Sequence, residues 1–176
     1  MEKKSFYEEF SDVKMRLEIW VSGANRQIDR LKKDLKNMNI AENEIEKWSW
    51  NVSRINDDNF LRIAVNNSIK WLKEFNKFII ETNDIYKELS NERDIKDLRN
   101  MTEHDIEYYY EKGHYQNRYI NKKTNLCAFD TGITENDYLI GGRLSLKYIE
   151  DKFENLGKIL KEGKFTMNMS YIMRAN

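Results

Sequence analysis

Apolar residues recur along the first part of the chain at alternating steps of four and three, the spacing of one face of an α-helix. The series predicts a long amphipathic helix that begins near Phe6 and stops between Asn37 and Asn39, where polar residues replace the apolar ones. Its members are Phe6, Phe10, Val13, Leu17, Trp20, Ala24, Ile28, Leu31 and Leu35.

Two further helices are predicted in the middle of the chain. Residues 41–56 are ambiguous, because their apolar positions have helical spacing but two tryptophans lie on different faces. The cluster Asn56–Asn59 consists of residues that favour helix N-caps, so we expect the second helix from about Asp57 to Thr82. After the charged connector "KELSNERD", a third helix is expected from about Asp94 to Glu111, ending at Gly113.

The pattern changes between Asn125 and Gly142. Two short apolar runs, 126–129 and 138–140, flank turn-forming residues and predict a small β-hairpin. Ser145 is then expected to cap a last helix that ends at Gly163, while residues 164–176 form a tail that either frays or docks. The apolar face of this helix contains Leu146, Ile149, Phe153, Leu156 and Leu160.

The composition favours a single helical domain over residues 1–176. One hydrophobic core can serve a chain of 176 residues, and the absence of proline leaves long helices uninterrupted. We therefore predict an all-α fold, a four- to five-helix up-and-down bundle, with the small β-hairpin near residues 125–142.

The charge balance restricts the possible partners. Charged residues make up 34% of the chain but sum to a formal net charge of zero, so a site for a polyanion such as RNA has to be local. No apolar segment approaches the roughly 20 residues needed to cross a bilayer, so no membrane association is expected and the cytoplasm is the default location. The single cysteine, Cys127, excludes an internal disulfide and is expected to be a buried structural thiol.

The predicted third helix contains an arginine and a histidine that are candidate site residues. Its core face is assigned to Ile95, Leu98, Thr102, Ile106 and Tyr109. Asn100, His104 and Tyr108 form a second row that suits a contact surface. Arg99 and His104 are separated by about 140° around the helix, so they converge only if the arginine curls around or a second copy pairs across a two-fold axis.

The stretch "RNMTEH", Arg99 to His104, resembles the signature of HEPN domains: an arginine, a polar residue and, after a short gap, a histidine, late in an all-helical bundle. The resemblance implies a homodimer that acts as a metal-independent endoribonuclease, with the motif toward the start of a helix and two motifs facing each other. Arg99 would bind the phosphate, Asn100 would orient the histidine or the phosphate, and His104 would transfer protons. These roles fit chemistry near neutral pH, where histidine is either an acid or a base.

The alternative is a non-catalytic helical interaction or scaffold protein. In that case Arg99 pairs with Glu103 one turn later, His104 bonds Asn100 or Tyr108, and this face serves only a dimer or another protein partner. A partner helix would dock on the long first helix.

A basic strip follows the motif. Tyrosine rings can stack on unpaired bases and cations can neutralise phosphates, so the strip is a candidate RNA contact. The alternative is a solvated connector whose tyrosines pack on the edge of the bundle, and His114 is expected to be a polar loop residue. The candidate RNA-binding residues are Lys112, Tyr115, Arg118, Tyr119, Lys122 and Lys123.

No cofactor or metal site is predicted. "GGR", Gly141–Arg143, lacks the glycine spacing of a nucleotide loop and is expected to be a strand exit. The acids around His104 have no second Glu-x-x-His pair to complete a di-iron site, so they are expected to form a solvated acidic face. These acids are Glu103, Asp105, Glu107 and Glu111.

Overall fold

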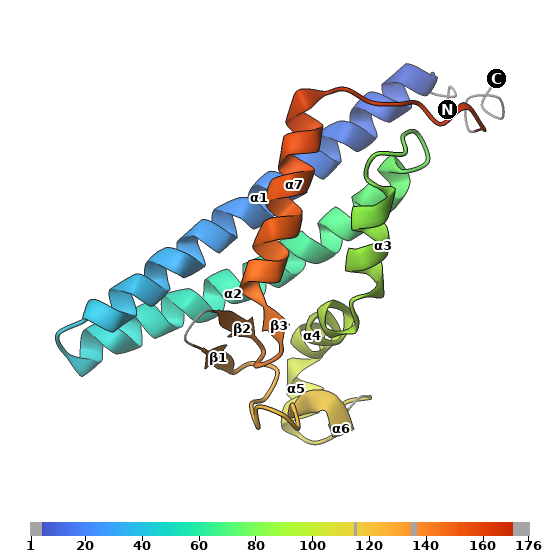
Figure 1. Ribbon diagram of the computed structural model, residues 1–176. Helices are drawn as coiled ribbons and strands as arrows, with labels where there is room; N and C mark the ends of the chain where they lie inside the picture. The colour runs from blue at the N-terminus through green and yellow to red at the C-terminus, as the bar shows by residue number, and fades with distance from the viewer. Residues whose placement is uncertain (1–4, 115, 135–136, 171–176) are drawn as a thin grey trace.

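Two long antiparallel helices form the frame on which the other elements pack (Figure 1). The computed structural model describes residues 5–114, 116–134 and 137–170. The frame consists of α1 (Phe6–Ile40) and α2 (Glu44–Phe75). The shorter helices are α3 (Asn83–Asn91), α4 (Arg93–Glu103), α5 (Asp105–Tyr109) and α6 (Gln116–Tyr119), and α7 (Leu146–Glu162) follows a small sheet.

The predicted first helix is confirmed. Ser5 and Glu8 form a capping box, in which the Ser5 hydroxyl accepts from the backbone N–H of Glu8 and the Glu8 carboxylate accepts from that of Ser5. The helix ends at Ile40, within a turn of the predicted stop. Most of the predicted apolar face is buried, and Phe6, Phe10, Trp20 and Leu35 are half-buried against the same core.

The predicted second helix was wrong at both ends. Asn43 caps α2 at Glu44, so Asn56–Asn59 lies inside the helix and is not an N-cap. Asp57 and Asp58 are buried there because each has a cationic partner, Arg30 and Arg62 respectively. The C-terminal end is also earlier, at Phe75, and the predicted charged connector contributes to α3.

The predicted third helix is broken at His104. The helix α4 ends at Glu103, His104 leaves the helical region with φ −120° and ψ 32°, and a new short helix begins at Asp105. The break turns Tyr108 into the core, whereas Tyr109, which was assigned to the core, is 75% exposed. The left-handed residue after α5 is Glu111, with φ 59°, and not Gly113.

The predicted hairpin is confirmed, with a shift of its first strand and one additional strand. Strands β1 (Thr131–Ile133), β2 (Tyr138–Ile140) and β3 (Leu144–Ser145) form an antiparallel sheet in the order β1-β2-β3. Thr131 pairs with Ile140, and Ile140 pairs with Leu144 on its other side. The apolar run 126–129 precedes β1.

The last predicted helix is confirmed as α7. The Ser145 hydroxyl accepts from the N–H of Tyr148, and Gly163 ends the helix in the left-handed region with φ 65°. All five predicted apolar positions of α7 are buried. The tail docks as far as it is described, since the N–H of Asn168 donates to the carbonyl of Phe78 at 2.6 Å.

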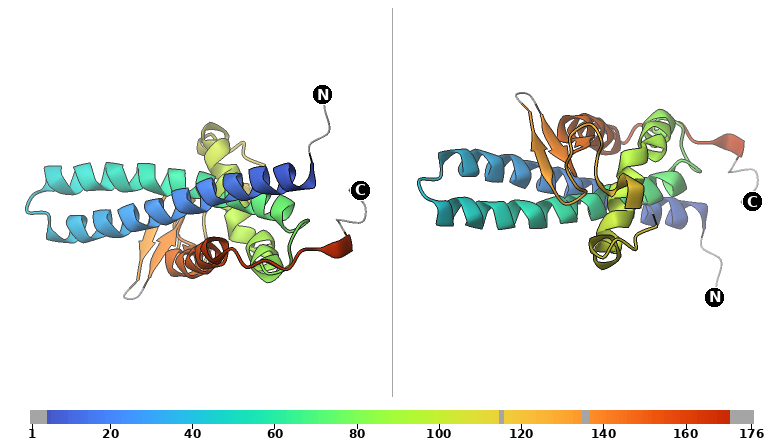
Figure 2. Two further views of the ribbon diagram at one scale, coloured as in Figure 1. Left: turned by 90° about the horizontal axis from the view of Figure 1, so that it is seen from above. Right: turned by 90° about the horizontal axis from the view of Figure 1, so that it is seen from below.

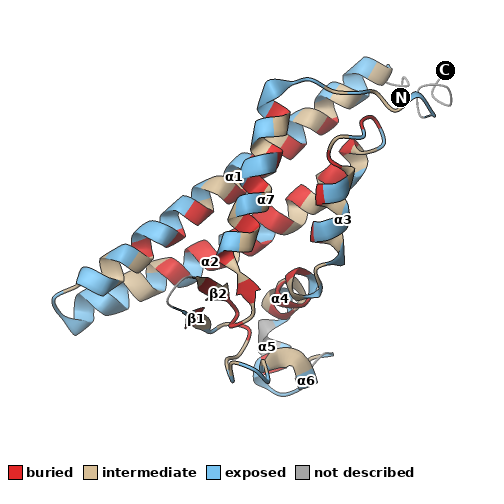
Figure 3. Cartoon of the chain, viewed as in Figure 1, coloured by how far each residue is buried: buried red, intermediate tan, exposed pale blue. Residues whose placement is uncertain are grey.

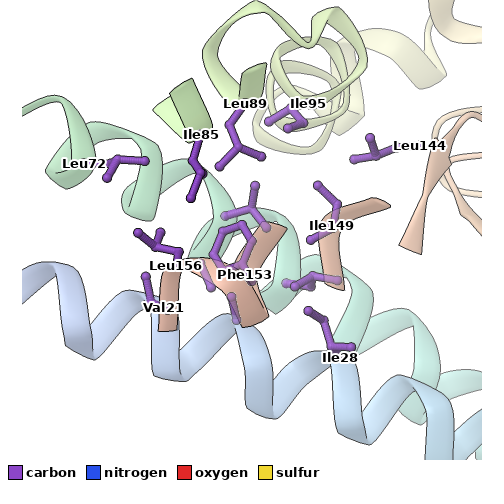
Figure 4. Packing of buried hydrophobic residues seen from close by; sticks show 14 of the residues in the cluster. Val21, Ile28, Leu72, Ile85, Leu89, Ile95, Leu144, Ile149, Phe153 and Leu156 are labelled. Carbon is purple, nitrogen blue, oxygen red and sulfur yellow. The ribbon is translucent and has the colours of Figure 1, made fainter. Parts of the chain in front are cut away.

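One hydrophobic core joins these elements. In Figure 4, Val21 and Ile28 of α1, Ile85 and Leu89 of α3 and Phe153 of α7 belong to one cluster. Figure 3 shows that burial is concentrated where α7, α3 and α4 approach the frame, while the distal turn of the α1–α2 hairpin is largely exposed. None of the described helices has the length and apolar character that crossing a membrane requires.

Candidate functional site

The motif occupies the last turns of α4, and not the start of a helix as the resemblance implies. Glu92 caps α4 at its beginning, and the backbone N–H of His104 donates to the carbonyl of Asn100 at its end. The buried side chains of Ile95, Leu98 and Met101 fix the orientation of the helix. The three proposed site residues of the motif, Arg99, Asn100 and His104, therefore lie on the remaining surface, next to the helix break.

Arg99 is engaged with its own helix. Its Nη2 lies 2.7 Å from Oε2 of Glu103, as the alternative interpretation of the motif predicts. Both side chains are more than a third exposed, so the pair stabilises the helix by only about 0.3 to 0.5 kcal/mol. Arg99 lines a pocket of about 340 Å³ between α2 and α4, together with Ile63 and Lys70.

His104 faces a different cavity. Its Nδ1 lies 3.1 Å from Oε1 of Glu107, a partner that the sequence did not predict. His104 lines a cleft of about 210 Å³, the histidine cleft, whose lining includes His114 and does not include Arg99. The chain has only these two histidines. The histidine cleft is lined by Asn100, His104, Glu107, Tyr108 and His114.

Asn100 is tied to the inner wall of the histidine cleft. Its Nδ2 donates to Oη of Tyr108 at 3.2 Å, and Tyr108 is almost fully buried. The structure therefore brings Asn100 and His104 to one cavity and Arg99 to another. Within one chain the three predicted catalytic residues do not surround a common substrate position.

His114 was missed as a site residue because the chain reverses direction before it. Gly113 packs on the ring of Tyr108 so closely that a Cβ would lie 2.3 Å from Cδ1 of that ring. This close approach returns the chain over Tyr108 and leaves His114 at the histidine cleft. The glycine was the only local signal, and it was interpreted as a helix end.

The basic strip forms part of a larger cavity, the basic pocket, of about 530 Å³ at the N-terminal end of α4. Of the predicted RNA-binding residues, Arg118, Lys122 and Lys123 line it, whereas Lys112 and Tyr119 do not. Tyr115 lies outside the described residues. The basic pocket is lined by Arg93, Asp94, Asn117, Arg118, Ile120, Asn121, Lys122, Lys123 and Arg143.

Tyr119 has a structural role. Its ring stacks on Tyr108, with centroids 5.5 Å apart and an interplanar angle of 19°. Tyr119 is half-buried against the core, as the alternative interpretation of the strip predicts. A base could not stack on the face that Tyr108 covers.

Arg143 holds the strip in place and adds a third guanidinium to the basic pocket. Its Nη1 and Nη2 donate to the carbonyls of Arg118 and Tyr119 at 2.8 and 3.0 Å. Gly141 and Gly142, with φ of 59° and 64°, form the turn between β2 and β3. This turn places the next residue, Arg143, at the basic pocket. "GGR" is thus a strand exit, as predicted, and it also supplies a pocket residue that sequence reasoning missed.

The electrostatics of the basic pocket favour an anion. Burial and the neighbouring Arg93 lower the pKa of Arg118, although Asp94 opposes this effect. Burial likewise lowers the pKa of Arg143. Burial raises the pKa of Asp94, the only carboxyl among the described residues of the lining. Arg118 also pairs with Asp97, so part of its charge is compensated. The described lining therefore has more cationic than anionic residues, a balance that favours an anion.

The described residues contain no cluster of three or more His, Cys, Asp or Glu side chains placed to hold a metal ion. Cys127 is half-buried, and the prediction of a buried thiol was wrong. The reason is that Cys127 lies before β1 in a loop, where it bridges Ile120 through the backbone instead of joining the core.

Comparisons with known proteins give no information about the role of these cavities. Comparison of the chain with models of protein families, with curated proteins and with solved structures found no significant match.

Proposed function

We propose that the protein binds RNA and that RNA phosphates occupy the basic pocket. The observation that carries this proposal is the pocket lining, whose described residues include five cationic ones and one with a carboxyl group, Asp94. Even with Arg118 paired to Asp97, four cationic residues of the lining remain against Asp94, so the lining is net positive. Because the chain has no net charge, attraction for a polyanion depends on such a local excess. Arginine is suited to phosphate because its planar guanidinium donates two parallel hydrogen bonds.

We further propose that the protein is a HEPN-like helical bundle and that its homodimer cleaves RNA without a metal ion. Arg99 would bind phosphate, Asn100 would position groups in the histidine cleft, and His104 would transfer protons. The separation of Arg99 from the histidine cleft means that a second chain has to supply the arginine. His104 and His114 give each cleft a possible base and a possible acid.

RNA binding is tested by the salt dependence of affinity for a labelled single-stranded RNA. The variant Lys122→Ala with Lys123→Ala should bind more weakly and should reduce the slope of log affinity against log salt by about 1.4, or 0.7 per lost phosphate contact. The matched control is Lys87→Ala with Lys158→Ala, which removes the same charge from α3 and α7. Equal slopes for the two double variants would refute binding at the basic pocket.

Cleavage is tested separately in EDTA, with the mass of each protein in solution measured alongside. Wild type should cleave RNA as a dimer, and Arg99→Ala or His104→Ala should abolish cleavage while the protein remains folded. RNA binding without cleavage would leave the protein as an RNA-binding derivative. Equal cleavage by all three proteins would exclude the composite site.

The second candidate function is a helical interaction or scaffold protein. It is favoured by apolar side chains exposed on α2, among them Ile45 at 79% and Trp48 at 68%. Exposed apolar residues that line up on one helix face mark a contact surface more often than isolated ones do. A protein that self-associates but does not bind RNA would support this candidate over the first.

A further inference from the structure

The basic pocket and the histidine cleft lie on the same side of α4. Arg93 lines the basic pocket and Asn100 lines the histidine cleft. On an ideal helix these two residues are separated by roughly 20° around the axis and by about 10 Å along it. The two cavities are therefore aligned on one face of α4, with the basic pocket at its beginning and the histidine cleft at its end.

The basic strip joins the same two cavities by a second route. His114 lines the histidine cleft, whereas Asn117 and Arg118 line the basic pocket. Because three residues of extended chain span at most about 11 Å, the backbone positions of His114 and Asn117 are no farther apart than this. Figures 1 and 2 show α6 beside α4 and α5, away from the distal turn of the α1–α2 hairpin. Two separate stretches of the chain thus give a similar separation.

The acid midway between the two cavities does not repel a phosphate strand. Asp97 lies between Arg93 and Asn100 on α4, but it is only 5% exposed. The guanidinium of Arg118 covers it and donates from Nη1 to its Oδ1 at 2.7 Å. The sequence from Lys112 to Lys123, which forms the other route, contains no acidic residue.

The two cavities supply complementary chemical groups. The described lining of the basic pocket has permanent cations, among them Arg93 and Arg143, but no histidine. The described lining of the histidine cleft has both histidines of the chain but no lysine or arginine. It also includes Glu107, whose carboxylate repels phosphate. A free phosphate ion therefore prefers the basic pocket, and a polyanion reaches the histidine cleft only if it is anchored elsewhere.

We propose that the basic pocket and the histidine cleft are two subsites of one RNA site, in which a phosphate anchored in the basic pocket places a more distant part of the same strand in the histidine cleft. The separation of about 10 Å corresponds to about three steps of a stacked strand, at roughly 3.4 Å per nucleotide. The inference rests on the proposed binding of RNA at the basic pocket. It adds the substrate class, which is an RNA strand of at least about four nucleotides.

Occupation of the histidine cleft can be measured directly, because the chain has only two histidines. Nuclear magnetic resonance should resolve the Cε1–H signals of His104 and His114, which the variants His104→Gln and His114→Gln assign. The probe is a 2′-fluoro hexauridylate, which lacks the hydroxyl group needed for cleavage. At constant pH this strand should shift both signals. Saturating inorganic phosphate, which occupies the basic pocket alone, should shift neither.

The dependence on strand length gives a second measurement. Affinities are measured for 2′-fluoro oligouridylates of two to eight nucleotides. The double variant His104→Gln with His114→Gln should bind the hexauridylate about ten-fold more weakly, which corresponds to the loss of one or two hydrogen bonds. The same variant should bind the dinucleotide as tightly as wild type does, because a dinucleotide anchored in the basic pocket does not reach the histidine cleft.

Failure of this inference is distinguishable from failure of RNA binding. The two subsites are not shared if Lys122→Ala with Lys123→Ala weakens hexauridylate binding but the hexauridylate shifts neither histidine signal, a result that retains RNA binding at the basic pocket. Equal shifts with inorganic phosphate and with hexauridylate, or an equal loss of affinity for both lengths, would also overturn the inference. If no oligonucleotide binds, the proposed function fails and this inference fails with it.

Discussion

The ion pair between Asp58 and Arg62 should be among the most sensitive points of the fold. Both side chains are 4% exposed. The guanidinium of Arg62 donates from Nε and Nη2 to the two carboxylate oxygens of Asp58, at 3.1 and 2.8 Å. Its Nη1 donates to Oγ1 of Thr102 at 2.9 Å, which connects α2 to the motif helix α4. Replacing Asp58 leaves a buried arginine without its counter-charge.

The expected cost of Asp58→Ala is about 3 to 5 kcal/mol, the range for removing one partner of a buried pair. With a urea dependence of about 2 kcal/mol per molar, this cost lowers the unfolding midpoint by roughly 2 M. Urea is preferred to guanidinium chloride because it does not screen charges. The assay is equilibrium unfolding monitored by circular dichroism.

Two comparisons make this reasoning refutable. Asp84→Ala, which breaks the exposed pair with Lys87, should cost no more than about 0.5 kcal/mol. Asp58→Leu combined with Arg62→Met should be more stable than Asp58→Ala, because the double variant buries no unpaired charge. If Asp58→Ala costs less than about 1 kcal/mol, the pair is effectively solvated and the reasoning fails.

Other consequences of the structure can be measured on purified protein. Burial, together with the nearby Asp58 carboxylate, raises the pKa of Tyr138 to about 12. Because this pKa lies above the unfolded value of about 10, the stabilisation is complete below pH 10 and is lost as the pH rises from 10 to 12. An ultraviolet titration should show a late phenolate step that Tyr138→Phe removes. Gly141→Ala should destabilise by about 3 kcal/mol, because φ is 59° and the new Cβ would lie 2.1 Å from Leu98. Gly163→Ala, at φ 65° but with no atom within 4 Å, should cost only about 1 kcal/mol, as thermal unfolding can establish.

The candidate sites depended on tertiary structure to different degrees. Arg118, Lys122 and Lys123 belong to the strip that was predicted from its composition between Lys112 and Lys123, and they line one pocket because basic residues adjacent in sequence remain adjacent in space. Lys112 and Tyr119 of the same strip do not line it. Arg93 and Arg143 could not be found in this way, since one begins α4 and the other follows β2. Only folding brings them to one pocket.

The sequence by itself determined the elements whose apolar faces are buried on one side. The helices α1 and α7 were predicted nearly to the residue, α1 from its periodicity and α7 from the agreement of periodicity, a serine cap and a terminal glycine. The charge balance likewise limited any polyanion site to a local patch. These features are properties of short stretches and do not depend on distant residues.

At positions where local sequence signals and packing favour different structures, the tertiary contacts determined the outcome. Asp57 and Asp58 have the sequence pattern of a cap, yet distant Arg30 and nearby Arg62 keep them within α2. His104 has helical neighbours on both sides, yet the helix breaks there and Tyr108 is buried. Burial or charge pairing contributes a free energy of a few kcal/mol, which exceeds the smaller preferences of individual residues for caps and helices. Tertiary packing therefore determined the bounds of these helices. It also determined the separation of Arg99 from the histidine cleft.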